Sequence, residues 1–213
     1  MPRYYPINLV LKNKKCAVIG AGNVAERKVR RLLECGAHVT VISPAITPGL
    51  KNMAQRGKII LKNRKVNLRD LDGAYLVIAA TTDRSINSAV SSYCRKNNIL
   101  INVVDSHEEC GFILPSIIRR GALTISISTD GISPTLARSI RIDLGRKFGK
   151  EYAEFLSLMK ALRPRAQNRI KDSRSRKAFF QKAVRSDAME LLKRNHKDQA
   201  KRALERILED ARP

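Results

Sequence analysis

The stretch CAVIGAGNVA, residues 16–25, joins an apolar, strand-like run to a helical pattern that continues to Leu33. Gly20 permits a tight turn, Gly22 lets the backbone approach a pyrophosphate, and the small Ala25 lets helix and strand pack closely. The free N–H groups at the start of the helix would face the anion. This spacing predicts a dinucleotide-binding turn, although glycines also occur in ordinary strand-to-helix turns.

Apolar, β-branched segments alternate with helical patterns through the first half of the chain, at residues 16–19, 38–42, 58–61, 75–80 and 99–104. This alternation is typical of a parallel sheet with helices on both faces, so we expect a Rossmann-like α/β domain. One helix is expected to begin after the N-cap Thr47, with Pro48 in its first turn, and to end near Gly57. Another is expected over residues 85–96.

The pattern changes after Val104. Residues 111–115 and 123–128 are predicted strands that lack the crossover helix of a parallel sheet. Apolar and hydroxyl side chains alternate along the second of these strands, which needs a neighbouring strand that a symmetric subunit could supply. Ser133 and Pro134 predict the start of a helix. Beyond residue 150 the chain is helical and highly charged, and Pro164 is expected to break the first helix there.

The chain is strongly basic, with a formal net charge of +23 over 213 residues. The excess is spread through both halves, and an anionic partner would explain it: nucleic acid, an anionic membrane or a polyanionic small substrate. A basic surface that merely keeps the protein soluble is the plain alternative. Aromatic residues make up only 5% of the chain and tryptophan is absent, which disfavours a platform for stacking bases.

The four cysteines lie far apart without a CxxC pair, which is typical of reduced cytoplasmic thiols. The first residues lack the apolar core of a signal peptide, and the longest apolar run, residues 74–80, is too short to cross a bilayer. We therefore expect a cytoplasmic protein that does not bind membranes.

Polar residues follow the predicted strands at the edge where ligands of parallel sheets bind. Ser43 occupies the position at which a carboxylate commonly binds the ribose diol, and no arginine adjoins it to hold a 2′-phosphate, which favours NAD over NADP. Small residues around Thr81 leave room for the nicotinamide ribose. Asp105 follows the last strand and is the candidate acid or base, with a turn or capping aspartate as an equal alternative.

His107 and Cys110 lie close to Asp105 and together suggest a metal site. Their irregular spacing favours instead a loop histidine and a buried cysteine, so no metal site is predicted.

Several motifs occur in order over residues 5–150 and resemble one known family. They are Pro6-Ile7, GAGNVAERK at 20–28, AAT at 79–81, NVVD at 102–105, FILPSI at 112–117 and ISTDGISPTLAR at 127–138. Together they resemble the precorrin-2 dehydrogenase / sirohydrochlorin ferrochelatase family of siroheme synthesis. The Ser-Pro-x-Leu-Ala-Arg block at 133–138 is far more specific than the glycine loop.

The resemblance implies a homodimer with a Rossmann-like NAD-binding domain, a small α+β dimerisation and substrate region, and a helical C-terminal domain. We expect these regions over residues 1–113, 114–150 and 151–213. The implied reaction is oxidation of precorrin-2 to sirohydrochlorin with NAD⁺ as hydride acceptor, and some members also insert Fe²⁺. The alternatives are a tetrapyrrole carrier or sensor that binds NAD without turnover and, more remotely, a basic nucleic-acid-binding protein.

The resemblance also assigns roles to residues. The essential aspartate of the family falls on Asp105, and its serine-rich strand end falls on Ser128 and Thr129. Its cofactor contacts fall on two pairs, Asn23 with Val24 and Pro44 with Ala45. The chain departs from the family in lacking a proline that often follows the aspartate, and in having Thr129 where some members have serine.

The implied substrate explains the charge, because a polycarboxylate tetrapyrrole would be attracted and oriented by a basic crevice. Guanidinium groups bind carboxylates through two parallel hydrogen bonds, so arginines of the second region are candidate clamps. Solvated surface arginines are the alternative. The candidate substrate-binding residues are Ser116, Arg119, Arg120, Ser128, Thr129, Arg138 and Arg141.

Overall fold

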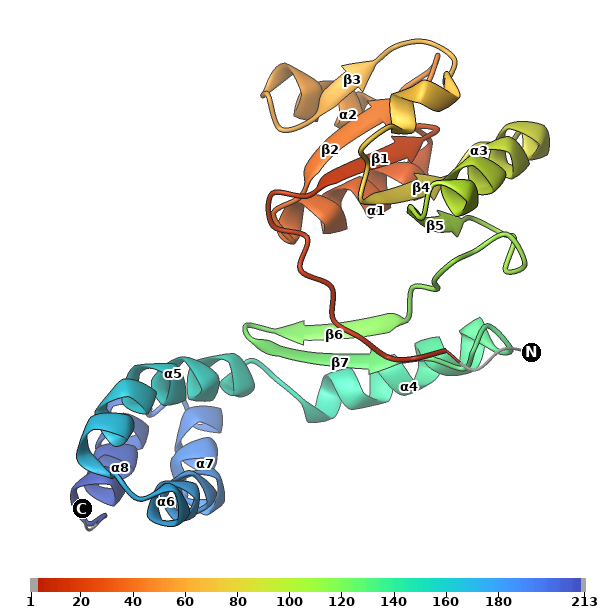
Figure 1. Cartoon of the computed structure of the whole chain (residues 1–213). Helices are drawn as coiled ribbons and strands as arrows, with labels where there is room; N and C mark the ends of the chain where they lie inside the picture. Colours follow the sequence, from red (N-terminus) through yellow and green to blue (C-terminus); the bar gives the residue numbers. More distant parts are fainter. Residues whose placement is uncertain (1–3, 212–213) are drawn as a thin grey trace. The chain divides into compact units, whose positions relative to one another are not determined.

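A computed structural model describes residues 4–211 of the chain. Its contacts divide the chain into two compact units, one ending at Leu114 and the other beginning at Pro115 (Figure 1). The finer division into regions 1–113, 114–150 and 151–213 stays a prediction. No helix in the described part of the chain is both long enough and apolar enough to cross a membrane.

The first unit is built on a sheet of five parallel strands in the order β3-β2-β1-β4-β5. The strands are β1 (Lys15–Ile19), β2 (His38–Ile42), β3 (Ile60–Lys62), β4 (Leu76–Ala79) and β5 (Leu100–Val103). The chain returns to the centre of the sheet between β3 and β4, which is the doubly wound order of a nucleotide-binding fold. The predicted Rossmann-like α/β fold is confirmed.

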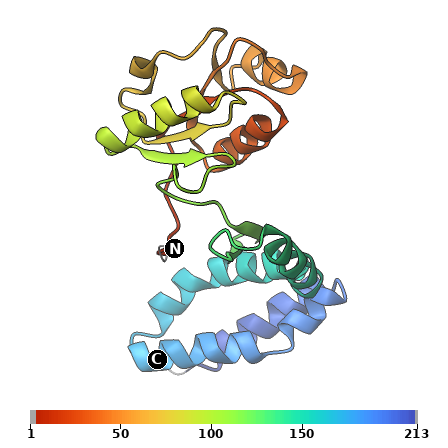
Figure 2. The same cartoon turned by 90° about the vertical axis from the view of Figure 1, so that its right-hand side faces the viewer.

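Helices cover both faces of this sheet (Figure 2). They are α1 (Asn23–Glu34), α2 (Pro48–Gln55) and α3 (Arg84–Lys96), with a short 3₁₀ helix, η1 (Leu68–Leu71). Side chains of the strands alternate between two cores, so Val18 packs with α1 and α2 while Ala17 and Ile19 pack with α3 and η1. Burial on both faces explains why the strands are almost continuously apolar.

Capping residues place the starts of these helices. Thr47 is the N-cap of α2, as predicted, and its hydroxyl accepts a hydrogen bond from the N–H of Leu50 at 3.3 Å. The helix α3 begins at Arg84, one residue earlier than expected, because the Asp83 carboxylate accepts from the N–H groups of Ser85 and Ile86.

The second unit begins with an antiparallel hairpin of β6 (Ser116–Arg120) and β7 (Leu123–Ile127), on which α4 (Pro134–Lys147) packs. The prediction of a strand over residues 111–115 is wrong. The N–H groups of Gly111 and Phe112 both donate to the carbonyl of Ile101, at 2.8 and 3.3 Å, and Pro115 has no N–H to donate. Pairing therefore starts at Ser116, and β7 takes its neighbouring strand from its own chain.

Four helices complete the second unit: α5 (Glu151–Arg169), α6 (Ser173–Arg185), α7 (Ala188–Lys193) and α8 (Lys197–Glu209). They enclose a separate apolar core. The prediction that Pro164 breaks the first of them is wrong, since α5 continues through it. Pro164 lies on the exposed side, where water can satisfy the carbonyl that it leaves unpaired, while Leu162 and Ala166 anchor the buried side.

We predict that Leu204→Ala destabilises the helical core by about 2–5 kcal/mol, because the side chain of Leu204 is fully buried and its truncation leaves a cavity. Urea unfolding followed by circular dichroism measures the loss. Val184→Ala is the control, since Val184 is 64% exposed and should change stability by less than about 0.5 kcal/mol. Equal midpoints for the two variants would contradict this description of the core.

Candidate active site

The carboxyl ends of the parallel strands meet at one edge of the sheet, and the predicted site residues of the first unit lie there (Figure 1). The glycine turn follows β1, Ser43 follows β2, Thr81 follows β4 and Asp105 follows β5. Ligands of doubly wound sheets bind at this edge, next to the point where the strand order reverses. The fold therefore brings these candidates to one edge.

The glycine turn has two glycines with different roles. Gly20 has a φ of +94°, and a Cβ at this position would lie 2.5 Å from the carbonyl oxygen of Ala80. Gly22 is exposed, a Cβ there would meet nothing within 4 Å, and no side chain caps the helix that it begins. The uncapped N–H groups at the start of α1 and the open space above Gly22 fit a pyrophosphate.

Ser43 forms a small turn at the end of β2. Its hydroxyl donates to the carbonyl of Ala45 at 2.7 Å, so its proton is used within the protein. The expected contact with a ribose is thereby limited to accepting a hydrogen bond from a ribose hydroxyl. Pro44 and Ala45 are exposed, and the N–H of Thr47 donates to Ala21 at 3.3 Å, which holds this turn against the glycine loop.

Thr81 is held by a residue that the sequence analysis missed. The Thr81 hydroxyl lies 2.8 Å from the amide oxygen of Asn87, whose nitrogen donates to the Thr81 carbonyl at 3.0 Å. Asn87 is buried in α3. Its spacing from Val90, Ser91 and Cys94 puts it on the buried face of α3, and a polar residue at such a position is the signal that could have identified it, because buried polar groups need partners.

Asp105 is exposed and lies in a turn, with a left-handed φ of +64°. The thiol of Cys110 closes the loop that presents it: the N–H of Val103 donates to Sγ at 3.2 Å, and Sγ lies 3.1 Å from the carbonyl of Ser106. Burial raises the pKa of the Cys110 thiol, so the neutral form persists. Cys110 therefore supports the loop rather than supplying a thiolate.

His107 is exposed in the same loop. Over residues 4–211, no group of three or more histidine, cysteine, aspartate or glutamate side chains is placed to hold a metal ion.

A cationic cluster follows β3 and was also missed from the sequence. The Asp70 carboxylate, 6% exposed, accepts two hydrogen bonds from the Arg64 guanidinium, both at 2.7 Å, and one from Lys62 Nζ at 2.7 Å. The N–H of Asn67 adds a fourth at 2.9 Å. Chiefly through the Arg64 hydrogen bond, this network holds the pKa of Asp70 far below its usual range.

In the second unit, the predicted hydroxyl residues gather at one end of the hairpin. Ser116 pairs with Ile127, so Ser128 and Thr129 follow directly beside it. Ser128 Oγ accepts from the N–H of Asp130 at 3.1 Å, and Thr129 Oγ1 accepts from the N–H of Ser133 at 3.1 Å. Both side chains thus organise the loop that begins α4.

The candidate arginines of the second unit are distributed along it. Arg119 pairs with Thr124 toward the hairpin turn, away from the hydroxyl end. Arg138 is exposed and Arg141 half-buried on α4, three residues apart as predicted.

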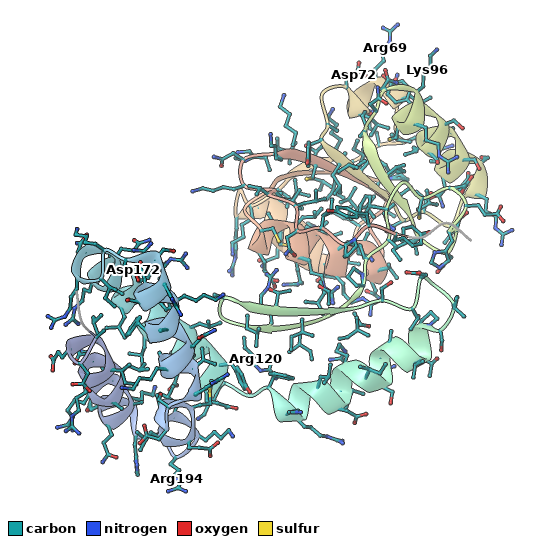
Figure 3. All side chains as sticks on the ribbon, turned by 60° about the horizontal axis from the view of Figure 1, so that its bottom comes forward. Arg69, Asp72, Lys96, Arg120, Asp172 and Arg194 are labelled. Carbon is teal, nitrogen blue, oxygen red and sulfur yellow. The ribbon has the colours of Figure 1, made fainter. Side chains whose placement is uncertain are left out.

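Arg120, which was expected to be a substrate clamp, serves a structural role. Its guanidinium donates to the carbonyls of Gly145 and Phe148 at 3.1 and 3.0 Å and joins the end of α4 to the hairpin (Figure 3). The unpaired carbonyls at a helix C-terminus attract such a cation, so the expectation for Arg120 is corrected.

Three family models match successive parts of the chain. Their descriptions are putative NAD(P)-binding over residues 7–116, sirohaem biosynthesis protein central over 120–146, and sirohaem synthase dimerisation region over 151–208. The NAD(P)-binding region comes first in both, but the models place the dimerisation region at residues 151–208, whereas the resemblance implied dimerisation within residues 114–150.

Two siroheme synthases and a solved structure are also similar to this chain. A siroheme synthase of Thioalkalivibrio sulfidiphilus is 37% identical over 97% of this chain, and one of Methylococcus capsulatus is 36% identical over 94%. The chain spans 42% of the length of each relative. The structure described as SirC, precorrin-2 dehydrogenase, matches with a TM-score of 0.80 at 24% identity, over 95% of this chain and all of that one. This last similarity shows the fold.

We predict that Gly20→Ala and Gly22→Ala separate folding from ligand binding. Gly20→Ala should lower the thermal stability of the first unit, because the new Cβ would clash with Ala80 in a left-handed conformation that costs about 1–3 kcal/mol. Gly22→Ala should unfold as the parent protein does and bind dinucleotide more weakly, since its Cβ fills the open space. Calorimetric titration and thermal unfolding measure both, and a reversed pattern would refute these roles.

We predict that acid weakens the first unit partly through Asp70. Its pKa is lowered in the folded protein, so its contribution is present above the unfolded-state value of about 3.9 and is lost as the pH falls below it. Asp70→Asn should therefore flatten the decline of the free energy of unfolding between about pH 5 and pH 2. An unchanged slope in urea unfolding series would contradict the assignment.

Proposed function

We propose that the chain oxidises precorrin-2 to sirohydrochlorin with NAD⁺, because it belongs to the putative NAD(P)-binding family matched over residues 7–116 and is similar to siroheme synthases. The observation that carries the proposal is the exposed carboxylate of Asp105 at the same sheet edge as the uncapped glycine turn. A hydride acceptor and a proton acceptor are the two components that such an oxidation needs.

Residues of the first unit suit the parts of a dinucleotide. The N–H groups of Asn23 and Val24 would hold the pyrophosphate, and the turn from Ser43 to Ala45 would hold the adenosine ribose. Thr81 would lie beside the nicotinamide ribose. Bound NAD⁺ supplies the hydride acceptor.

We assign to Asp105 the role of proton acceptor. Oxidation of the macrocycle removes a hydride and a proton, and a carboxylate oxygen of Asp105 accepts the proton. The exposed position of Asp105 suits this role, because the carboxylate must reach a substrate rather than pack in the interior. The left-handed turn and the Cys110 contacts hold the loop in the shape that presents it.

We assign to the second unit the binding of the substrate's carboxylates. Arg119, Arg138 and Arg141 offer guanidinium groups for bidentate hydrogen bonds, and the net charge of +23 favours a polyanionic ligand. The hydroxyls of Ser116, Ser128 and Thr129 are proposed to contact the same ligand. The match of residues 151–208 to a dimerisation region supports a homodimer.

We also propose a metal substrate and a cellular compartment for this protein. Fe²⁺ is a second substrate in this proposal, because the relatives are named siroheme synthases and an exposed carboxylate can take the pyrrole N–H protons that leave as iron enters. The free, buried thiols of Cys16 and Cys94 suit a reducing compartment, so we place the protein in the cytoplasm.

We predict that Asp105→Asn lowers the rate of NADH formation from precorrin-2 by about 10²- to 10⁴-fold and leaves the Kd for NAD⁺ unchanged. Asparagine is chosen because it tolerates the left-handed backbone of this position. The assay is anaerobic and follows NADH absorbance, with calorimetric titration of NAD⁺ alongside. Glu108→Gln, which removes an exposed carboxylate from the same loop, should retain activity.

The same assay distinguishes the alternatives. Near-normal turnover by Asp105→Asn would remove the proton-accepting role. Binding of NAD⁺ and precorrin-2 by the parent protein without NADH would indicate a carrier or sensor. Salt-sensitive binding of random duplex DNA with no NADH would indicate a nucleic-acid-binding protein. A second absorbance change on adding Fe²⁺ reports iron insertion.

A further inference from the structure

The segment after β3 lies beside the position that would hold the adenosine ribose. The N–H of Ser43 donates to the carbonyl of Lys62 at 3.2 Å. When the Asn63 amide is oriented so that its donors face acceptors, its nitrogen donates to the carbonyls of Ser43 and Pro44, just after β2, at 3.1 and 3.2 Å. The backbone of residues 62–63 therefore runs directly alongside the ribose position.

Two cations come with this segment. Lys62 and Arg64 flank Asn63, and their side chains are 37% and 50% exposed. A lysine or arginine beside the end of the second strand is the usual means of binding the 2′-phosphate of NADP. No arginine adjoins Ser43 in the sequence, but the fold brings Arg64 and Lys62 beside it, and their presence alone would favour NADP.

Asp70 prevents Lys62 and Arg64 from favouring NADP. Its carboxylate takes the Arg64 guanidinium through two parallel hydrogen bonds and the Lys62 ammonium through one, so both cations turn toward η1. A guanidinium whose parallel donors are paired with a carboxylate cannot pair with a phosphate in the same way. Asp70 thereby neutralises one of the two charges and takes two N–H groups of the Arg64 guanidinium and one of the Lys62 ammonium.

The ribose position itself offers no means of rejecting a phosphate. Dinucleotide-binding domains that take NAD commonly carry a carboxylate at the end of the second strand, and Ser43 stands there instead. We propose that Asp70 is the residue that determines cofactor specificity, by holding Lys62 and Arg64 away from the 2′-position and so favouring NAD over NADP. This inference rests on the dinucleotide binding proposed above.

Glu26 of α1 is a carboxylate that bonds to Thr47, just after the turn at residues 43–45, and it provides a control for the loss of one negative charge. Its carboxylate accepts from the Thr47 hydroxyl at 2.5 Å and from Arg30 at 2.6 Å. Removing its charge would change the electrostatic potential near the turn, but it would release neither Lys62 nor Arg64. Glu26→Gln therefore separates a general charge effect from release of the two cations.

The experiment measures the Kd values of NAD⁺ and NADP⁺ for the full chain by calorimetric titration, at about 50 mM salt, where screening is weak. The parent protein should bind NAD⁺ more tightly. Asp70→Asn should shift the ratio of the two Kd values toward NADP⁺ by about tenfold, which corresponds to one charge-assisted hydrogen bond to the phosphate. Glu26→Gln should shift it by less than about threefold.

Arg64→Gln keeps the test decisive even if Asp70→Asn folds poorly, and a double variant tests the part played by Lys62. Arg64→Gln leaves the Asp70 carboxylate less neutralised and should weaken NADP⁺ binding further, with NAD⁺ binding little changed. Lys62→Gln combined with Asp70→Asn should lose part of the tenfold gain. Stronger NADP⁺ binding by Arg64→Gln would overturn the inference.

The remaining outcomes are also distinct. A parent protein that prefers NADP⁺, or equal shifts for Asp70→Asn and Glu26→Gln, would overturn the role of Asp70. If the parent protein forms NADH from precorrin-2 and Asp70→Asn leaves the Kd ratio unchanged, only this inference fails. If the parent protein binds neither dinucleotide, the proposed function fails and takes the inference with it.

Discussion

The hydrogen-bonded ladder around β1 is the constraint on which the first unit depends. β1 lies between β2 and β4, and pairing continues one residue past its end: Gly20 donates to Ile42 at 3.0 Å, and Ala80 donates to Ile19 at 2.8 Å. The chain must turn into α1 within this space, with a backbone carbonyl where a Cβ would stand. Only glycine fits at position 20, where φ is +94° and the Ala80 carbonyl leaves no room for a Cβ.

The loops at this edge are held by polar contacts formed within the protein. The Ser43 hydroxyl, the Thr81–Asn87 pair and the Cys110 thiol each close one loop. A site whose loops are ordered before binding loses less conformational entropy when a ligand arrives. Two cationic side chains near this edge are also held within the protein, because Asp70 pairs with both Lys62 and Arg64.

The second unit is stabilised by different interactions from those of the parallel sheet. Its hairpin is too small to be stable alone and is completed by α4, with Arg120 joining the end of that helix to β6. The later helices have their own apolar core, and burial on one side lets α5 accommodate Pro164 on the other. Arg138 and Arg141 of α4 are exposed and half-buried, so an anionic ligand can reach them.

The sequence alone determined the parallel sheet, the glycine turn, the caps at Thr47 and Ser133 and the position of Asp105, because these depend on local residue type and hydrophobic period. It did not determine that residues 111–115 stay irregular or that Arg120 caps a helix. It also missed the Asn87, Cys110 and Asp70 contacts. Arg120 bonds to residues 25 and 28 positions further along the chain. The Asn87, Cys110 and Asp70 contacts span only 3–8 residues, but their partners meet only when the loop or helix that carries each one has packed on the sheet, so tertiary structure decided them as well.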